Sequence, residues 1–142
     1  MTKSSDEVER NKAIIRAFYD GAERGDISSF GAFLHPDFQV SVPNYLPWGG
    51  THSGAEHFLK DVLPQAAKVL DFSKYSYEHF TTEGNHIVVL IKVGVEGSNA
   101  IIRVADHWDL KDGKVVSLLV TYYEPQALLE RLGRPNALTA RA

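Results

Sequence analysis

Cysteine is absent from the sequence, which excludes disulfide bonds and thiolate metal sites and fits a reducing compartment. Long apolar runs are absent too, and the longest aliphatic run, residues 87–91, is far too short to span a bilayer. Basic residues are not in excess: the net charge is -3, and no basic run marks a surface for nucleic acid or an anionic membrane. The polar start, MTKSSDEVERNK, lacks an apolar segment, so we expect no signal peptide and a cytoplasmic location.

What remains is the composition of an ordinary globular protein. Hydrophobic residues make up 44% of the 142 residues, and the composition does not change along the chain. We therefore expect a single domain over residues 1–142, with its core at about 8–124. The remaining residues, 125–142, are expected to form a short helix and a loose tail.

The spacing of apolar residues changes along the chain. The first half has helical spacing and predicts helices over about 5–24, 26–34 and 54–69, with Pro64 kinking or splitting the third. A short strand is expected within 35–43, followed by a loop in NYLPWGGTH. From residue 71 apolar residues recur at every second position, which predicts strands at about 71–82, 86–96, 99–110 and 114–124. The short turn sequences EGN, EGSN and KDG imply antiparallel neighbours and an α+β fold.

One of these expected strands carries an unusual carboxylate. In VADHWDLKDG, residues 104–113, side chains alternate between the two faces of a sheet, so Asp106 and His107 point in opposite directions. Asp106 shares its face with apolar residues only: Ile102, Val104, Trp108 and Leu110. A lone carboxylate among apolar side chains is costly to ionise unless it is paired. Asp106 is therefore either a structural carboxylate with a buried partner or a candidate catalytic residue.

Several motifs together resemble the nuclear transport factor two-like superfamily. They are ERGD after the first helix, FLHPDFQV, GGTHSG, and the final hairpin ADHWDLKDGKVVSLLVTYYEP, and the resemblance covers about residues 8–124. Within the superfamily the sequence is most similar to the SnoaL-like polyketide cyclases and the ketosteroid isomerases. The resemblance implies a cone-shaped, curved antiparallel sheet wrapped around three N-terminal helices, with a cavity between them. It also implies a homodimer formed through the sheet.

The resemblance implies a role for Asp106. It also implies that two functional side chains of the isomerases are not present at the corresponding positions here. Asp106 falls on the strand acid that ketosteroid isomerases keep protonated, so that it donates a hydrogen bond to a developing oxyanion. In SnoaL-like cyclases a deep aspartate acts as acid and base, and Asp106 matches it best. The tyrosine donor and the proton-shuttling aspartate of the isomerases correspond here to Phe18 and Val42, so neither group is present in that position.

Three further side chains are candidate catalytic residues. Tyr122 is in phase with the inward side of its strand and could donate to an oxyanion, although a buried tyrosine is often simply part of a core. Tyr19 could replace the missing donor if the helix is slightly rotated. His52 could reach the cavity mouth and supply the missing base. No metal site is expected, because the six histidines form no two-histidine helical pair.

The remaining candidate residues would bind substrate. They are Phe18, Tyr45, Trp48, Val93, Val104, Trp108, Leu118 and Val120. The apolar loop over residues 45–52 is expected to be either a mobile lid over the ligand or a part of the core. His107, on the opposite face, is expected at the surface or at a dimer contact.

These features predict a cofactor-independent acid/base enzyme. It would be a polyketide-type cyclase or an isomerase acting on a small hydrophobic carbonyl compound in the cavity, with no nucleic-acid or membrane partner. Three alternatives remain open: a non-catalytic binding protein, a cyclase that acts mainly by folding its substrate, and an epoxide hydrolase.

Overall fold

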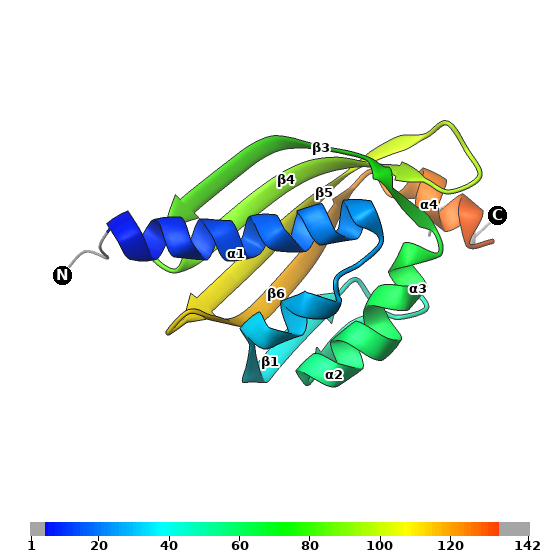
Figure 1. Ribbon diagram of the computed structural model, residues 1–142. Helices are drawn as coiled ribbons and strands as arrows, with labels where there is room; N and C mark the ends of the chain where they lie inside the picture. Colours follow the sequence, from blue (N-terminus) through cyan, green and yellow to red (C-terminus); the bar gives the residue numbers. More distant parts are fainter. Residues whose placement is uncertain (1–4, 134–142) are drawn as a thin grey trace.

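The structure, a computed structural model, describes residues 5–133 of the chain (Figure 1). The strands are β1 (Leu34–Val42), β2 (Gly50–Ser53), β3 (Leu70–Glu83), β4 (His86–Val95), β5 (Ile101–Lys111) and β6 (Lys114–Tyr123). The helical segments are α1 (Ser5–Arg24), the 3₁₀ helix η1 (Ser28–Phe33), α2 (Ala55–His57), the π-helix η2 (Phe58–Val62), α3 (Leu63–Ala67) and α4 (Gln126–Arg131). The expected tail over 134–142 lies outside the described residues.

The strands form one curved, mixed sheet in the order β2-β1-β6-β5-β4-β3. The expected meander is confirmed, because β3, β4, β5 and β6 pair as antiparallel neighbours. The expectation of a wholly antiparallel sheet is wrong, since β1 runs parallel to β6, with Val40 opposite Leu118. β2 was also missed, because four residues with a glycine at the start give too weak a pattern; it pairs antiparallel with β1.

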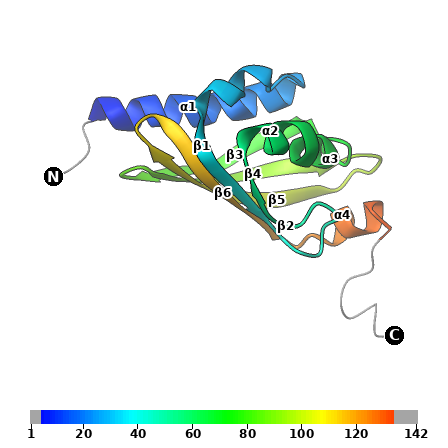
Figure 2. The same ribbon diagram turned by 90° about the horizontal axis from the view of Figure 1, so that it is seen from below.

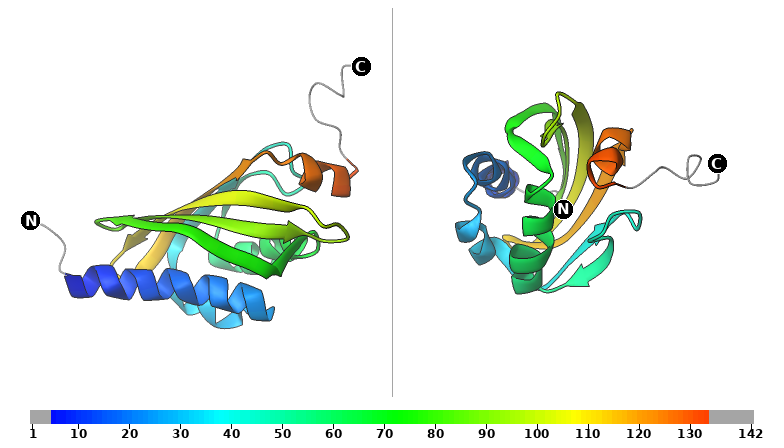
Figure 3. Two further views of the ribbon diagram at one scale, coloured as in Figure 1. Left: turned by 90° about the horizontal axis from the view of Figure 1, so that it is seen from above. Right: turned by 90° about the vertical axis from the view of Figure 1, so that its right-hand side faces the viewer.

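The helices α1, η1 and α2 to α3 lie on the inner side of the curved sheet (Figures 2 and 3). The first helix has the expected bounds and buries Ile15, Phe18 and Tyr19 on the face that meets the sheet. It ends before Gly25, whose positive φ of 76° is easily adopted without a side chain. Among the described residues, no helix is both long enough and apolar enough to cross a membrane.

The other two expected helices differ in form from regular α-helices. Residues 26–34 contain the short 3₁₀ helix η1, and residues 54–69 contain three consecutive helical pieces. In the π-turn of the second segment, the backbone N–H of Leu63 donates to the carbonyl of Phe58, five residues earlier. Pro64 follows directly and has no N–H to donate, so the regular hydrogen-bond series cannot continue through it. The expected split at Pro64 is thus a widened turn just before it.

The inward side of the sheet forms the core together with the helices. Burial alternates along β5, so that Val104, Asp106 and Trp108 are buried while Ala105 and His107 are partly exposed. The alternation confirms that Asp106 and His107 lie on opposite faces. The core therefore contains a carboxyl group in the middle of the sheet.

Candidate functional site

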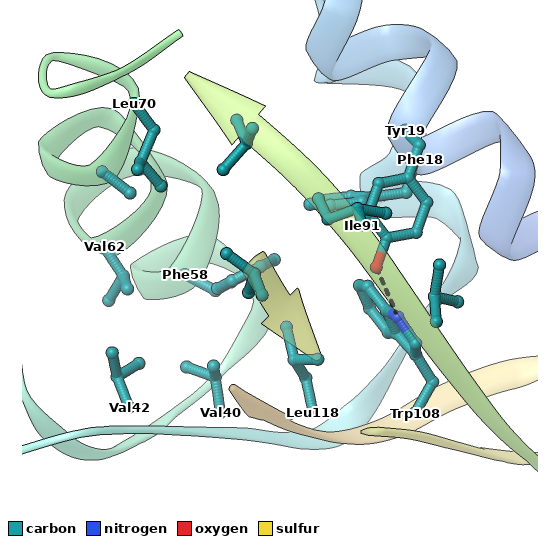
Figure 4. Packing of buried hydrophobic residues seen from close by; sticks show 14 of the residues in the cluster. Phe18, Tyr19, Val40, Val42, Phe58, Val62, Leu70, Ile91, Trp108 and Leu118 are labelled. Atoms are coloured by element: carbon teal, nitrogen blue, oxygen red, sulfur yellow. Dashed lines mark hydrogen bonds between the residues drawn. The ribbon is translucent and has the colours of Figure 1, made fainter. Parts of the chain in front are cut away.

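A cavity of about 60 Å³ lies between the inner side of the sheet and the broken helix α2 to α3. Its walls come from β1, β5 and β6 on one side and from residues 58–66 on the other. Figure 4 shows part of this wall, where Val40, Val42 and Leu118 face Phe58 and Val62. The lining is apolar apart from the carboxyl of Asp106 and the hydroxyl of Tyr122.

Two hydrogen bonds in series fix the position of the Asp106 carboxyl. The Tyr19 hydroxyl donates to Oδ2 of Asp106 over 2.5 Å, and the Trp108 indole Nε1 donates to the Tyr19 oxygen over 3.1 Å (Figure 4 shows the second bond). Within the described part of the chain, Tyr19 is the one donor to this carboxyl. The second oxygen, Oδ1, does not take part in these hydrogen bonds, and Asp106 itself lines the cavity.

Burial changes the protonation of this group. Desolvation raises the pKa of Asp106 to about 7, and the hydrogen bond from Tyr19 offsets part of that rise. Burial, and then the nearby Asp106 carboxyl, raise the pKa of Tyr19 well above its ordinary value. Tyr19 therefore keeps its proton and donates a hydrogen bond to Oδ2, so a proton taken up by Asp106 resides on Oδ1.

Tyr122 is the second polar group on the cavity wall. It lies opposite Val104, while Asp106 lies opposite Val120, so Tyr122 and Asp106 are diagonal neighbours on the same face of the sheet. Burial, followed by the charge of Asp106, raises the pKa of Tyr122 far above its ordinary value. Its hydroxyl therefore stays neutral and remains a hydrogen-bond donor.

The family model for the SnoaL-like domain matches residues 15–118, which include the second half of α1, most of the cavity wall and Asp106. The chain belongs to the SnoaL-like domain family. No curated protein matches it.

Solved structures share the fold of this SnoaL-like chain. TerC, co-crystallised with polyporic acid, is 24% identical, with a TM-score of 0.70 over 87% of this chain and 98% of its own. A protein from Kribbella flavida named as a ketosteroid isomerase is 15% identical, with a TM-score of 0.67 over 82% of this chain and 79% of its own. One from Sinorhizobium meliloti named as a polyketide cyclase is 18% identical, with a TM-score of 0.61 over 77% of this chain and 94% of its own. Others are NTF2-like proteins of unknown function.

The structure of the SnoaL-like domain separates the residues expected at the site into two groups. Those that line the cavity are Asp106, Tyr122, Phe18, Trp48, Val104, Leu118 and Val120. Those that lie outside its wall are Tyr19, Trp108, Val93, Tyr45 and His52. Tyr19 and Trp108 instead form the hydrogen-bond chain to Asp106. Val93 is buried one inward position beyond Ile91, and Tyr45 is 40% exposed on the loop.

His52 is turned away from the cavity. Its Nε2 lies 2.9 Å from the carbonyl oxygen of Trp48, and its Nδ1 lies 3.0 Å from Nε2 of His57. His57 in turn contacts Asp61 through Nδ1 at 2.9 Å, as expected for residues four apart on a helix. Both ring nitrogens of His52 are therefore engaged at the surface, so the expectation of a base at the cavity mouth is wrong. The described residues contain no group of three or more side chains that could hold a metal ion.

The loop between β1 and β2 is packed rather than open. Leu46 and Trp48 are buried in the core, and Trp48 is only 4% exposed. Gly49 lies so close to the loop backbone that a Cβ there would come within 2.3 Å of the carbonyl oxygen of Pro43. Gly49 thus permits a close approach of the loop backbone, which favours the packed alternative over a mobile lid.

Part of the cavity wall was not anticipated from the sequence. It includes Phe58, Val62 and Ala66 on the broken helix, with Leu70 and Phe72 after it. The first three recur at intervals of four, which is the signal of one helix face. That periodicity predicts burial, but it does not distinguish a cavity wall from a filled core.

We expect the Tyr19→Phe variant to raise the pKa of Asp106 above about 7, because the hydrogen bond that lowers this pKa is lost. The variant should also lose about 1–3 kcal/mol of stability, since the Trp108 N–H is left buried without an acceptor. A carboxyl NMR titration and urea unfolding measure the two effects. Tyr75→Phe, which removes an exposed hydroxyl next to Asp20, is the matched control and should change neither value. A lower pKa in Tyr19→Phe would contradict the geometry.

Proposed function

We propose that this protein is a cofactor-independent acid/base enzyme of the cyclase or isomerase type, acting on a small hydrophobic carbonyl compound. The observation that carries the proposal is the buried Asp106 carboxyl, which faces an apolar cavity with a pKa of about 7. A group with that pKa has both protonation states available near neutral pH, as general acid/base catalysis requires.

The geometry supports different chemical roles for two residues, Asp106 in proton transfer and Tyr122 as a hydrogen-bond donor. The Asp106 carboxylate removes a proton from the carbon next to the carbonyl group, and the electron pair of that C–H bond moves to form an enolate. The Tyr122 hydroxyl donates a hydrogen bond to the enolate oxygen. Where a C=C bond extends the enolate, Asp106 returns the proton to the far carbon, which gives an isomer. Alternatively the enolate carbon attacks a second carbonyl carbon, which closes a ring, and the alkoxide formed from that carbonyl takes the proton from Asp106.

Tyr19 and Trp108 are positioning residues in this scheme. Their hydrogen bonds fix Oδ2 of Asp106 and leave Oδ1 for the substrate. Phe18 and Val42, which stand where the isomerases have a donor and a base, form apolar wall. One carboxyl therefore serves both as base and as acid.

The proposed chemistry can be tested by deuterium exchange. Wild-type protein in D₂O should introduce deuterium next to the carbonyl of cyclohexanone or 2-tetralone, with a rate that rises with pH and levels off above about pH 7, where Asp106 is ionised. Tyr122→Phe should lower the rate about 10²-fold without moving the midpoint. Binding of these ketones without any exchange above the buffer rate would contradict the proposal and favour a non-catalytic binding protein.

We also propose that two copies associate through the outer face of the sheet. Ile101, Leu119 and Tyr123 are 50%, 47% and 60% exposed there, and an exposed apolar patch commonly marks an interface. His107 lies opposite Leu119 on the same face. Light scattering should give the mass of a dimer for the wild type and of a monomer for Leu119→Arg. An unchanged mass in the variant, or a monomeric wild type, would rule out this interface.

A further inference from the structure

A second, larger cavity adjoins the first. It has a volume of about 220 Å³ and lies between the end of α1, the start of η1 and the broken helix. Phe18, Leu63 and Phe72 belong to the walls of both cavities. These three side chains therefore form a partition between an inner chamber, which contains Asp106, and an outer chamber, which reaches the surface at Pro64 and Ala67.

The inner chamber is too small to hold a whole substrate. Ligand sites commonly enclose about 300–1,000 Å³, whereas the inner chamber encloses about 60 Å³. That space suits a carbonyl group and its neighbouring carbons. The rest of a larger molecule needs another place, and the outer chamber lies directly behind the partition.

The partition residues lie where the backbone is irregular. Leu63 follows the π-turn and precedes Pro64, so its helical segment lacks a regular hydrogen-bond series. Phe72 lies in a register shift between β3 and β4, because the pairs on either side are Asp71 with Gly94 and Ser76 with Lys92. Side chains crowd against Gly94 there, since a Cβ would lie 3.2 Å from that of Asp71. Phe72 has no partner in the pairing of β3 with β4, so it can move away from Leu63 without breaking a hydrogen bond between these two strands.

The outer chamber also has a definite chemistry. Its lining consists of apolar side chains and one glycine, and none of the charged residues within 5–133 contributes to it. A charged or strongly polar group would lose its water there without gaining a partner. The occupant of this chamber is therefore a hydrocarbon or aromatic portion of the ligand.

We infer that the substrate is an elongated apolar carbonyl compound that passes between Leu63 and Phe72, with its carbonyl at Asp106 and its apolar tail in the outer chamber. This inference rests on the proposed function for the carbonyl end. It assigns the tail to Ala22, Ile27, Leu59 and Ala67, residues that line only the outer chamber.

The test uses straight-chain methyl ketones from 2-butanone to 2-dodecanone, with dissociation constants from NMR titration. In the wild type, affinity should rise by about fourfold for each added methylene that enters the outer chamber. Long ketones should shift the methyl signals of Ala22 and Ala67, and 2-butanone should not. An affinity that does not change with chain length would overturn the inference.

Two variants distinguish the contributions of the two chambers to ketone affinity. Ala67→Phe fills the outer chamber from an exposed position, so it should remove the chain-length dependence and leave the affinity for 2-butanone unchanged. Lys68→Phe, which adds the same ring one residue later outside the chamber lining, is the matched control and should behave as the wild type. An undiminished dependence in Ala67→Phe would overturn the inference.

The test also separates this inference from the proposed function. Chain-length dependence without deuterium exchange would leave the two-chamber site standing and remove the catalytic proposal. Deuterium exchange into cyclohexanone, together with ketone affinities that do not depend on chain length, would leave the catalytic proposal standing and remove the two-chamber site.

Discussion

The Asp106→Asn variant should lose about 10²–10⁴-fold in the rate of deuterium exchange while it gains stability above pH 7. The loss follows because an amide cannot take up or return the proton. The gain follows because the amide removes a buried charge but can still accept the Tyr19 hydrogen bond through its oxygen. Loss of activity with increased stability is the signature of a carboxyl that burial keeps in an unfavourable state.

The sign of the stability change follows from proton binding. The pKa of Asp106 rises from 3.8 to about 7 on folding, so between these values the native state holds a proton that the unfolded state has lost. The stability of the wild type therefore falls as pH rises from about 4 to about 7, by up to about 4 kcal/mol, and the fall is complete above that range.

Urea unfolding at intervals between pH 4 and pH 8 measures this effect. Asp106→Asn should flatten the fall and unfold at higher urea than the wild type at pH 8. Asp109→Asn, which removes a charge from the outer face of the same strand, should retain both the pH dependence and the exchange activity. A parallel pH dependence in Asp106→Asn and the wild type would show that Asp106 is not the group responsible.

The Trp48→Ala variant should lose about 3–5 kcal/mol of stability, the usual cost of removing a large aromatic side chain from a core. Trp48 is 4% exposed, and it lies in the same buried cluster as Phe58 and Leu46. A mobile lid would behave differently, because truncation would weaken ligand binding and leave stability nearly unchanged.

Urea midpoints and the affinity for 2-tetralone, measured together, distinguish these roles. Tyr45→Ala truncates a 40% exposed ring on the same loop and should cost much less stability. A loss below about 1 kcal/mol for Trp48→Ala, with weaker binding, would return Trp48 to the role of a lid.

The sequence was most informative where a repeating pattern has a single physical interpretation. Alternation along residues 101–111 places Asp106 inward and His107 outward, and the structure agrees. The helix over 5–24 follows in the same way from its apolar stripe. Both predictions depend only on geometry that is local to one element.

Properties that depend on how elements meet could not be obtained in this way. Phe18 and Tyr19 are adjacent on α1, and only its rotation against the sheet decides that Phe18 borders the cavity while Tyr19 holds Asp106. The orientation of His52 depends on the short strand β2, which the pattern did not reveal. The parallel pairing of β1 depends on contacts with residues about 80 positions later in the chain.

That parallel pairing has a consequence for folding during synthesis on the ribosome. Residues 34–41 of β1 find their partners at positions 115–119 of β6, so the strand emerges long before its neighbour exists. Contacts between such distant positions form slowly, because a long loop must close before they contribute. The edge of β1 that pairs with β6 thus remains open until synthesis is nearly complete, although its other edge can already pair with β2. Nascent chains halted before residue 115 are therefore expected to bind chaperones through this segment, and full-length chains to be released from them.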